Sequence, residues 1–255
     1  VYGSLEYLLN QKNTLSVTGI LASNRRGRSA AITQEVFDLV GNEYNPYWGN
    51  QNGKIRNSRE RNIQEPLFLL NYVHESKGVT INAGLGYQTG KYTRSRLGYY
   101  NAPNPDPTYY RYLPSFYINS PIGANFESAI SARDGFLKSP QLDWDKIYRA
   151  NGSSSQNGTA AYVFYDDTVK DNQFTARVNV NLELNDHFQL DFGTTYRQLN
   201  SKNYALIEDL LGAEFHTDID PLSETLNDMG AEVNKLPGDI FNYNYELKAS
   251  TLDVY

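Results

Sequence analysis

Histidine and carboxylate side chains are the groups with which this sequence could bind a metal ion or catalyse a reaction. His74 and His187 lie in predicted short turns, whereas His216 is followed at alternate positions by Asp218 and Asp220. Nitrogen and oxygen ligands on one side of an extended segment could hold a divalent cation. A solvated loop turn explains the same residues more simply, and we prefer that interpretation.

The remaining patterns with chemical potential also have simpler structural interpretations. Asp166 and Asp167 form an acidic pair that we interpret as loop surface, with calcium binding as the less favoured alternative. The glycines of residues 84–90 lack the dinucleotide-binding spacing and fall inside a predicted strand. The chain has no cysteine, no Gly-x-Ser-x-Gly sequence and no His-Glu-x-x-His sequence. We therefore predict that it is not an enzyme and uses no catalytic residue, cofactor or metal.

Composition narrows the class of protein further. The 255 residues include 21 tyrosines, and the formal net charge is -6 at pH 7. An acidic chain does not provide the basic face that nucleic-acid binding requires. No window reaches the run of about 18 apolar residues expected for a membrane-spanning helix. Strands of a membrane barrel need only about 9–11 alternating residues, a pattern that an averaged hydropathy hides.

Alternation of apolar and polar residues predicts the elements that position these side chains. Residues 174–184 alternate without a break, the polar turn 185–187 follows, and residues 188–197 alternate again. This pattern predicts a β-hairpin. The same pattern predicts two further hairpins and one more strand, in residues 5–18, 67–88 and 241–248.

The predicted connections alternate between short turns and long loops, which span approximately residues 24–62, 98–171 and 199–239. Such loops are uncommon in compact soluble domains, whereas outer-membrane β-barrels combine tight periplasmic turns with long extracellular loops. We therefore predict an all-β fold in which residues 1–255 form part of a single, larger transmembrane β-barrel. About seven antiparallel strands cannot close alone, because their edges would lie unpaired in lipid. A secreted soluble β-sandwich is the alternative.

In such a barrel the apolar face of each strand contacts lipid and the polar face lines the lumen. The alternation of the hairpin at residues 174–197 assigns polar side chains to the lumen. The lumen-facing candidates are Arg177, Asn179, Glu183, Asp191 and Arg197.

Aromatic residues crowd the second long loop, where several prolines limit the conformational freedom of the chain. We predict that this loop contacts a ligand or a partner. The candidate residues are Tyr99, Tyr109, Tyr110, Tyr112, Tyr117 and Trp144. Stiff aromatic loops suit a sugar, a peptide or a chelate, and they equally suit packing between loops over the barrel mouth.

Five loop segments resemble recurring segments of TonB-dependent receptors from the Bacteroidota. They are residues 45–59, 104–114, 143–148, 207–213 and 238–245. The first of them has the sequence NPYWGNQNGKIRNSR. The resemblance implies a barrel of about twenty-two strands that is plugged by an N-terminal domain. It also implies energy-dependent import of a scarce nutrient through contact with TonB. No segment resembling the plug, the TonB box or the terminal strand is found in these residues.

The expected function is therefore that of a bacterial outer-membrane TonB-dependent receptor, importing a glycan, a peptide or a metal chelate. The expected partners are outer-membrane lipid, the rest of the barrel, its plug, TonB and a surface lipoprotein, but no nucleic acid. The alternative is a structural or docking barrel that binds a surface lipoprotein or a secretion component without transport.

Overall fold

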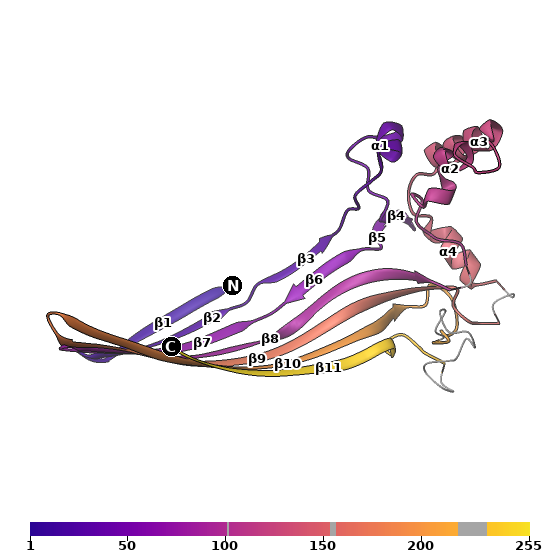
Figure 1. Cartoon of the computed structure of the whole chain (residues 1–255). Helices are drawn as coiled ribbons and strands as arrows, with labels where there is room; N and C mark the ends of the chain where they lie inside the picture. Colours follow the sequence, from indigo (N-terminus) through magenta and orange to yellow (C-terminus); the bar gives the residue numbers. More distant parts are fainter. Residues whose placement is uncertain (101, 154–156, 219–233) are drawn as a thin grey trace.

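The computed structural model describes residues 1–100, 102–153, 157–218 and 234–255, and it consists mainly of one curved antiparallel sheet (Figure 1). Seven strands follow one another in the sheet in chain order. They are β1 (Tyr2–Asn10), β2 (Asn13–Ile20), β7 (Leu67–Ser76), β8 (Val79–Tyr99), β9 (Tyr162–Asn185), β10 (Phe188–Asp209) and β11 (Ile240–Val254). The predicted all-β fold with an antiparallel sheet is confirmed.

Two short strands extend the sheet beyond β2 and β7. They are β3 (Ser23–Gly27) and β6 (Glu60–Gln64), and β6 also pairs with β8. The pairing with β8 keeps its register across the gap, because Gln64 lies opposite Lys91 and Leu67 lies opposite Gln88. Pro66 lies in this gap and cannot donate a backbone hydrogen bond.

The remaining elements lie beyond one end of the sheet, opposite the short turns (Figure 1). A small hairpin consists of β4 (Trp48–Gln51) and β5 (Lys54–Asn57). The helices are α1 (Gln34–Val40), the 3-10 turn at Tyr110–Tyr112, α2 (Pro114–Ile118), α3 (Phe126–Lys138) and α4 (Trp144–Asn151). Within the described ranges, none of these helices is long and apolar enough to cross a membrane.

The two faces of the sheet differ in character along its turn-side half. Residues directly opposite each other on neighbouring strands lie on the same face. One continuous cross-strand row on the first face is Leu5, Val17, Leu70, Leu85, Ala176, Tyr196 and Leu252. The adjacent row on the second face is Glu6, Ser16, Asn71, Gly84, Arg177, Thr195 and Asp253. We call the first face the apolar face and the second the polar face.

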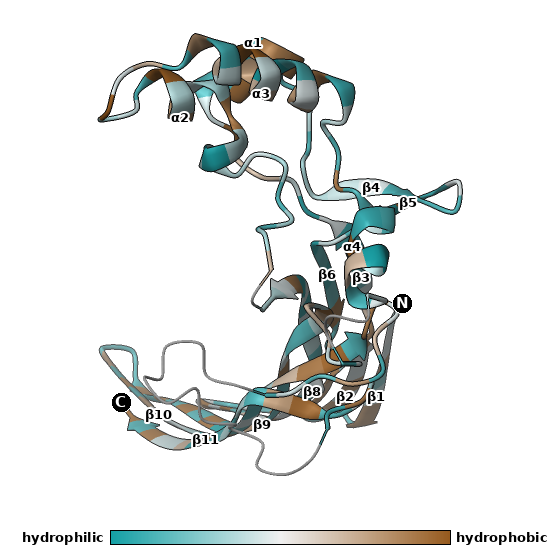
Figure 2. Ribbon diagram, turned by 90° about the vertical axis from the view of Figure 1, so that its right-hand side faces the viewer, coloured by the Kyte–Doolittle hydropathy of each residue, from teal (hydrophilic) through white to brown (hydrophobic). Residues whose placement is uncertain are grey.

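Buried hydrophobic side chains gather at the loop end of the sheet. Leu97, Trp144, Tyr162 and Leu211 belong to one cluster, and a second cluster forms around Val163, Ile207 and Phe241. A third cluster joins α1 to α3 through Val36, Leu113 and Phe136. By contrast, the apolar face keeps Val178 at 40% and Phe192 at 48% exposure, and Figure 2 shows apolar segments along the uncovered strands.

The predicted bounds of the long loops were wrong, because three strands continue further than expected. β8 reaches Tyr99, β9 begins at Tyr162, and β10 reaches Asp209, whereas the sequence predicted loops at 98–171 and 199–239. The first loop, predicted at 24–62, begins and ends in β3 and β6. The loop-side halves of β8, β9 and β10 carry polar residues on both faces of the sheet. Apolar and polar residues therefore do not alternate there, although the backbone pairing of the strands continues.

Gly90 in β8 provides a test of the close approach between strands beside Pro66. A Cβ atom at Gly90 would lie 2.2 Å from the Gln64 backbone oxygen and 2.6 Å from the Glu65 Cα atom. We expect Gly90→Ala to lower the free energy of unfolding by about 1–3 kcal/mol, because neither backbone atom can move without breaking the ladder. Urea unfolding of the full-length protein measures this loss. Gly3→Ala is the matched control, because nothing lies within 4 Å of that position, and equal stability of the two variants would contradict the prediction.

Candidate ligand site at the loop end of the sheet

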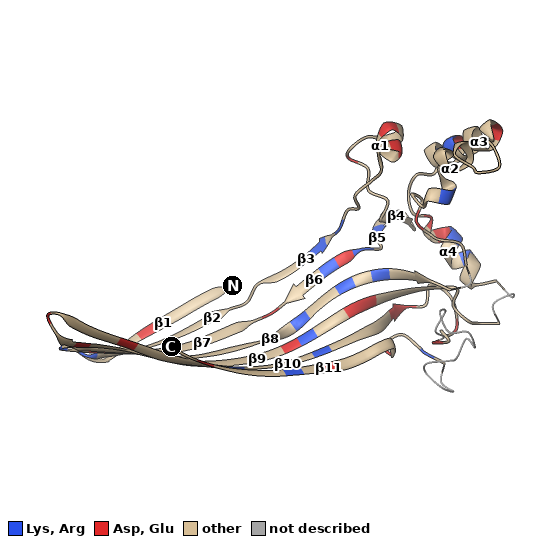
Figure 3. Ribbon diagram, in the orientation of Figure 1, with Lys and Arg blue, Asp and Glu red and all other residues tan. Residues whose placement is uncertain are grey.

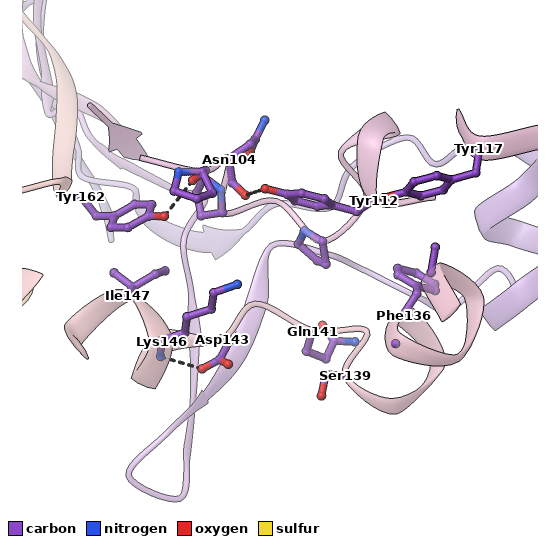
Figure 4. A pocket seen from close by; sticks show the side chains of 15 residues that line it. Asn104, Tyr112, Tyr117, Phe136, Ser139, Gln141, Asp143, Lys146, Ile147 and Tyr162 are labelled. Atoms are coloured by element: carbon purple, nitrogen blue, oxygen red, sulfur yellow. Dashed lines mark hydrogen bonds between the residues drawn. The ribbon is translucent and has the colours of Figure 1, made fainter. Parts of the chain in front are cut away.

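The connection between β8 and β9 folds over the loop end and encloses a cavity of about 390 Å³ with α3 and α4 (Figure 4). Its wall combines aromatic, proline and polar residues. The residues that line it include Asn104, Tyr112, Tyr117, Phe136, Asp143, Lys146 and Tyr162. A cavity of this size, with mixed walls and open to solvent, fits a small ligand.

Local hydrogen bonds fix the proline-rich wall of the cavity. The Tyr112 hydroxyl donates to the Asn104 carbonyl at 2.9 Å, and the Tyr162 hydroxyl donates to the Pro103 carbonyl at 2.8 Å. The Asp106 amide donates to Asn104 Oδ1 at 2.9 Å, and the Thr108 amide donates to Asp106 Oδ1 at 2.8 Å. A wall held in one conformation loses little entropy on binding.

The tyrosines of this loop form an exposed aromatic group beside the cavity. The Tyr109 ring contacts the Tyr110 ring edge-on at 4.8 Å between centroids and the Tyr112 ring at 5.3 Å. Burial, followed by a smaller effect of Tyr109, raises the pKa of the Tyr112 phenol above its ordinary value. The hydroxyl therefore stays protonated, and keeps donating its hydrogen bond to the Asn104 carbonyl, throughout the neutral and mildly alkaline range.

Lys146 brings positive charge to the cavity. The Asp143 side chain caps α4 by accepting from the Lys146 backbone amide at 2.8 Å, which orients the first turn of the helix (Figure 4). Among the described residues, no ion pair engages the Lys146 ammonium group. The group is therefore free to attract an oxygen acceptor or an anion on a ligand.

Trp144 does not take the ligand-contacting role that the sequence predicted for it. Its side chain is 0% exposed, and its ring nitrogen donates to the Arg56 carbonyl at 3.1 Å. The Arg56 guanidinium lies 4.3 Å from the centre of the Trp144 ring and forms an ion pair of 2.9 Å with Asp209. Trp144 therefore joins α4 to the β4–β5 hairpin, because burying an indole in this core is worth more than leaving it in the loop surface.

Asn151, the last residue of α4, connects this helix to the ends of β9 and β10. The sequence did not predict this role. Its Nδ2 donates to the backbone oxygens of Tyr162 at 2.8 Å, of Leu210 at 2.7 Å and of Leu211 at 3.3 Å. Its Oδ1 accepts from the amides of Ala161 and Tyr162, both at 2.9 Å. An asparagine near a helix end is common, so the sequence carries no signal that this one is buried.

The other candidate tyrosines lie in different surroundings. Tyr117 lines the same cavity as Tyr112, and Tyr110 lines a shallow neighbouring cavity with Phe116. Tyr99 lines a third cavity together with Tyr47 and Arg59. The structure thus brings Tyr112 and Tyr117 to one site and leaves Tyr99 at another.

The residues considered for cation binding instead contact other parts of the protein through ring packing, hydrogen bonds and an ion pair. The His216 ring packs at 4.6 Å from the Tyr100 ring and 5.3 Å from the Phe241 ring, and the Asp218 carboxylate accepts from the Asn242 amide at 2.9 Å. Asp220 lies outside the described residues. Asp167 forms an ion pair with Arg96 and accepts from the Tyr243 hydroxyl at 2.9 Å. In the described part of the chain, no three His, Asp or Glu residues form a group that could hold a metal ion.

The five lumen candidates lie together on the polar face, far along the sheet from the cavity. In the β9–β10 register, which is continuous from Gln189 to Ile207, Arg177 lies opposite Thr195, and Arg197 lies opposite Thr175. Asn179 Oδ1 accepts from the Tyr255 hydroxyl at 2.6 Å, and Asp191 accepts from Asn181 at 2.5 Å. Glu183 lies opposite Gln189. That this face lines a lumen stays a prediction.

Comparison with known proteins finds little. No protein-family model matches the sequence, and no curated protein matches it. Among solved structures, the chain is similar to the ferric-catecholate import receptor Fiu of E. coli K12 in its closed form, with a TM-score of 0.37 and 11% sequence identity. The similarity covers 99% of this chain and 29% of that receptor, so the chain spans 29% of its length. Values this low support no conclusion about function.

Proposed function

We propose that this chain forms part of the wall of an outer-membrane β-barrel, which works as a TonB-dependent receptor for a nutrient ligand. The observation that carries the proposal is the apolar face. Seven neighbouring strands present one unbroken apolar row there, and the polar row lies directly behind it. A soluble sheet would cover such a face with a second layer, but here it is open to the surroundings.

The height of the apolar face fits a bilayer. Along β9 its apolar residues run from Leu184 to Phe174, which is about 33 Å at roughly 3.3 Å per residue. A strand tilt of about 40° reduces this length to about 25 Å along the membrane normal, the height of the lipid-facing band of outer-membrane barrels. Phe68, Tyr87 and Phe174 form an aromatic row at the loop-side limit of the band, as expected for an interfacial girdle.

Closure of the barrel requires further strands. β1 and β11 are the two ends of the main strand order in the described sheet, and the short strand β3 beside β6 is a further edge. Since hydrocarbon offers no hydrogen-bond partner, both ends must pair with strands of the same barrel. The polar face would then line the lumen and contact a plug domain, through which TonB would supply energy for import.

The cavity beside Tyr112, Tyr117 and Lys146 is our proposed site of ligand capture. Its aromatic faces suit a glycan or a peptide, and Lys146 suits an anionic group such as a carboxylate or an anionic metal chelate. The function is tested by nutrient uptake in a strain that lacks the full-length gene. Loss of uptake for one nutrient class, restored by the gene, supports the receptor, whereas unchanged uptake of every glycan, peptide and chelate tested contradicts it.

A docking function is the second candidate, and one surface favours it. Ile122 is 98% exposed at the connection between α2 and α3, and Phe126 and Ile130 on α3 are 67% and 61% exposed. Exposed apolar patches of this kind mark protein interaction sites. A surface lipoprotein covering α3 fits both functions. Unchanged uptake together with loss of a lipoprotein complex would assign docking alone.

Lys146 allows the class of ligand to be determined. We expect Lys146→Gln to weaken binding of an anionic ligand by about 10- to 100-fold, because a hydrogen bond to a charged group is worth roughly 1.5–3 kcal/mol. A neutral glycan would lose only a few-fold. Calorimetric titration of the full-length protein with the transported nutrient measures the change. Lys138→Gln is the matched control, because that exposed lysine ends α3 outside the cavity wall, and equal affinities of both variants for an anionic ligand would exclude this cavity.

A further inference from the structure

Lysine residues form a cross-strand row on the apolar face beyond its aromatic limit. Lys91 of β8 lies opposite Lys170 of β9, and Lys170 lies opposite Lys202 of β10. These residues share the face of Tyr87 and Phe174, since they are separated from them by an even number of positions in a continuous register. Figure 3 shows the basic segments side by side on β8, β9 and β10.

The row places like charges next to one another on adjacent strands, and Lys170 has a lysine directly opposite it on each side. Lys202 lies opposite Glu246 of β11, but Glu246 forms its ion pair with Lys248, at 3.1 Å. Lys91 shares a pocket with Asp166 and Glu208, which partly balance its charge. Lys170 and Lys202 are exposed, and in the described chain neither forms an ion pair.

Like charges directly opposite each other destabilise a pair of strands. Three lysines in a row on adjacent strands therefore reduce the stability of the sheet unless an anion lies against them. The ordinary arrangement for a solvated wall would alternate the signs of the charges. The row is thus better explained by a negatively charged surface that contacts this height of the wall.

The height of the row identifies that surface. Lys170 lies four residues beyond Phe174, about 13 Å along the strand and about 10 Å along the membrane normal at a tilt of roughly 40°. The headgroup region begins where the hydrocarbon ends, at the aromatic row, and is several ångströms deep. Lysine side chains are long enough to reach into this region from just above it.

We infer that Lys170 and Lys202, with Lys91 beside them, bind phosphate-bearing headgroups of lipids in the leaflet on the loop side of the membrane. This inference rests on the proposed membrane-wall function. Ammonium groups are compact point charges that suit phosphate, and an array on three strands would hold more than one phosphate group. Such binding would fix the depth of the wall in the bilayer and offset the repulsion within the row.

The test uses the full-length protein in detergent, titrated with diphosphoryl lipid A and followed by native mass spectrometry. We expect Lys170→Gln combined with Lys202→Gln to weaken binding by about fivefold for each lysine removed. Lys54→Gln combined with Lys138→Gln is the matched control, because it removes the same charge from exposed positions in β5 and α3, outside the row. Binding should also decrease with ionic strength, and inorganic phosphate at the same concentration should not compete with the lipid.

Each outcome separates the two proposals. Equal lipid binding by both double variants, in a protein that inserts into vesicles, overturns the lysine site and leaves the membrane wall standing. Failure of the wild-type protein to insert into vesicles overturns the membrane wall itself. Binding of dephosphorylated lipid A as strong as that of the diphosphoryl form would show that the acyl chains, and not the phosphates, are recognised.

Discussion

Replacement of Asn151 by leucine is expected to separate α4 from the ends of β9 and β10. The side chain is 2% exposed and makes five hydrogen bonds to backbone groups. Leucine has the same branching and number of side-chain heavy atoms as asparagine, although it is larger, and it satisfies none of these groups. Each buried group that loses its partner costs roughly 1–3 kcal/mol, so we expect a total loss of at least about 3 kcal/mol.

Hydrogen exchange measures this effect where it occurs. The amides of Ala161 and Tyr162 donate to Asn151 Oδ1, and they should exchange much faster in the variant. Asn119→Leu is the matched control, because Asn119 is exposed at the end of α2, where surface substitutions usually change stability by less than about 0.5 kcal/mol. Unchanged protection of both amides in Asn151→Leu would mean that α4 is held by its apolar contacts alone.

Substitution of Val178 by arginine is expected to destabilise the sheet by about 2–4 kcal/mol, because on the proposed membrane wall an arginine at mid-bilayer would have to be desolvated. Val178 lies between Ala83 and Thr194 in the middle of the apolar face and is 40% exposed. In a water-soluble sheet the same substitution at a partly exposed position would change stability little. The substitution therefore tests the environment of this face directly.

Unfolding of the full-length protein by urea in lipid vesicles provides the measurement. Asn82→Arg is the matched control. Asn82 precedes Ala83, which lies opposite Val178, so Asn82 belongs to the polar face at nearly the same depth. We expect the control to lose less than about 1 kcal/mol. Equal losses in the two variants would mean that the assignment of the two faces is wrong.

The paired strands of the turn-side half were predictable from the sequence because their information is local. Residues 174–184 and 188–197 alternate in the printed sequence, and the short turn between them sets the register of β9 against β10. The same reasoning placed the five lumen candidates on one face. The prediction of strands failed beyond Phe174, because polar residues such as Lys170 and Asp167 occupy both faces of β9 there. Apolar and polar residues therefore do not alternate in that part of the sequence.

The tertiary structure decided everything that depends on pairing between distant segments. β8 and β9 are joined across residues 100–161, and only their register places Lys91 against Lys170. Trp144 was predicted at a ligand and lies instead in a core, because Arg56, 88 positions earlier, provides its hydrogen-bond acceptor. The sequence by itself thus determined which strands alternate and which loops carry tyrosines. The fold decided which polar side chains meet, because hydrogen bonds and like charges act between neighbours in space and not along the chain.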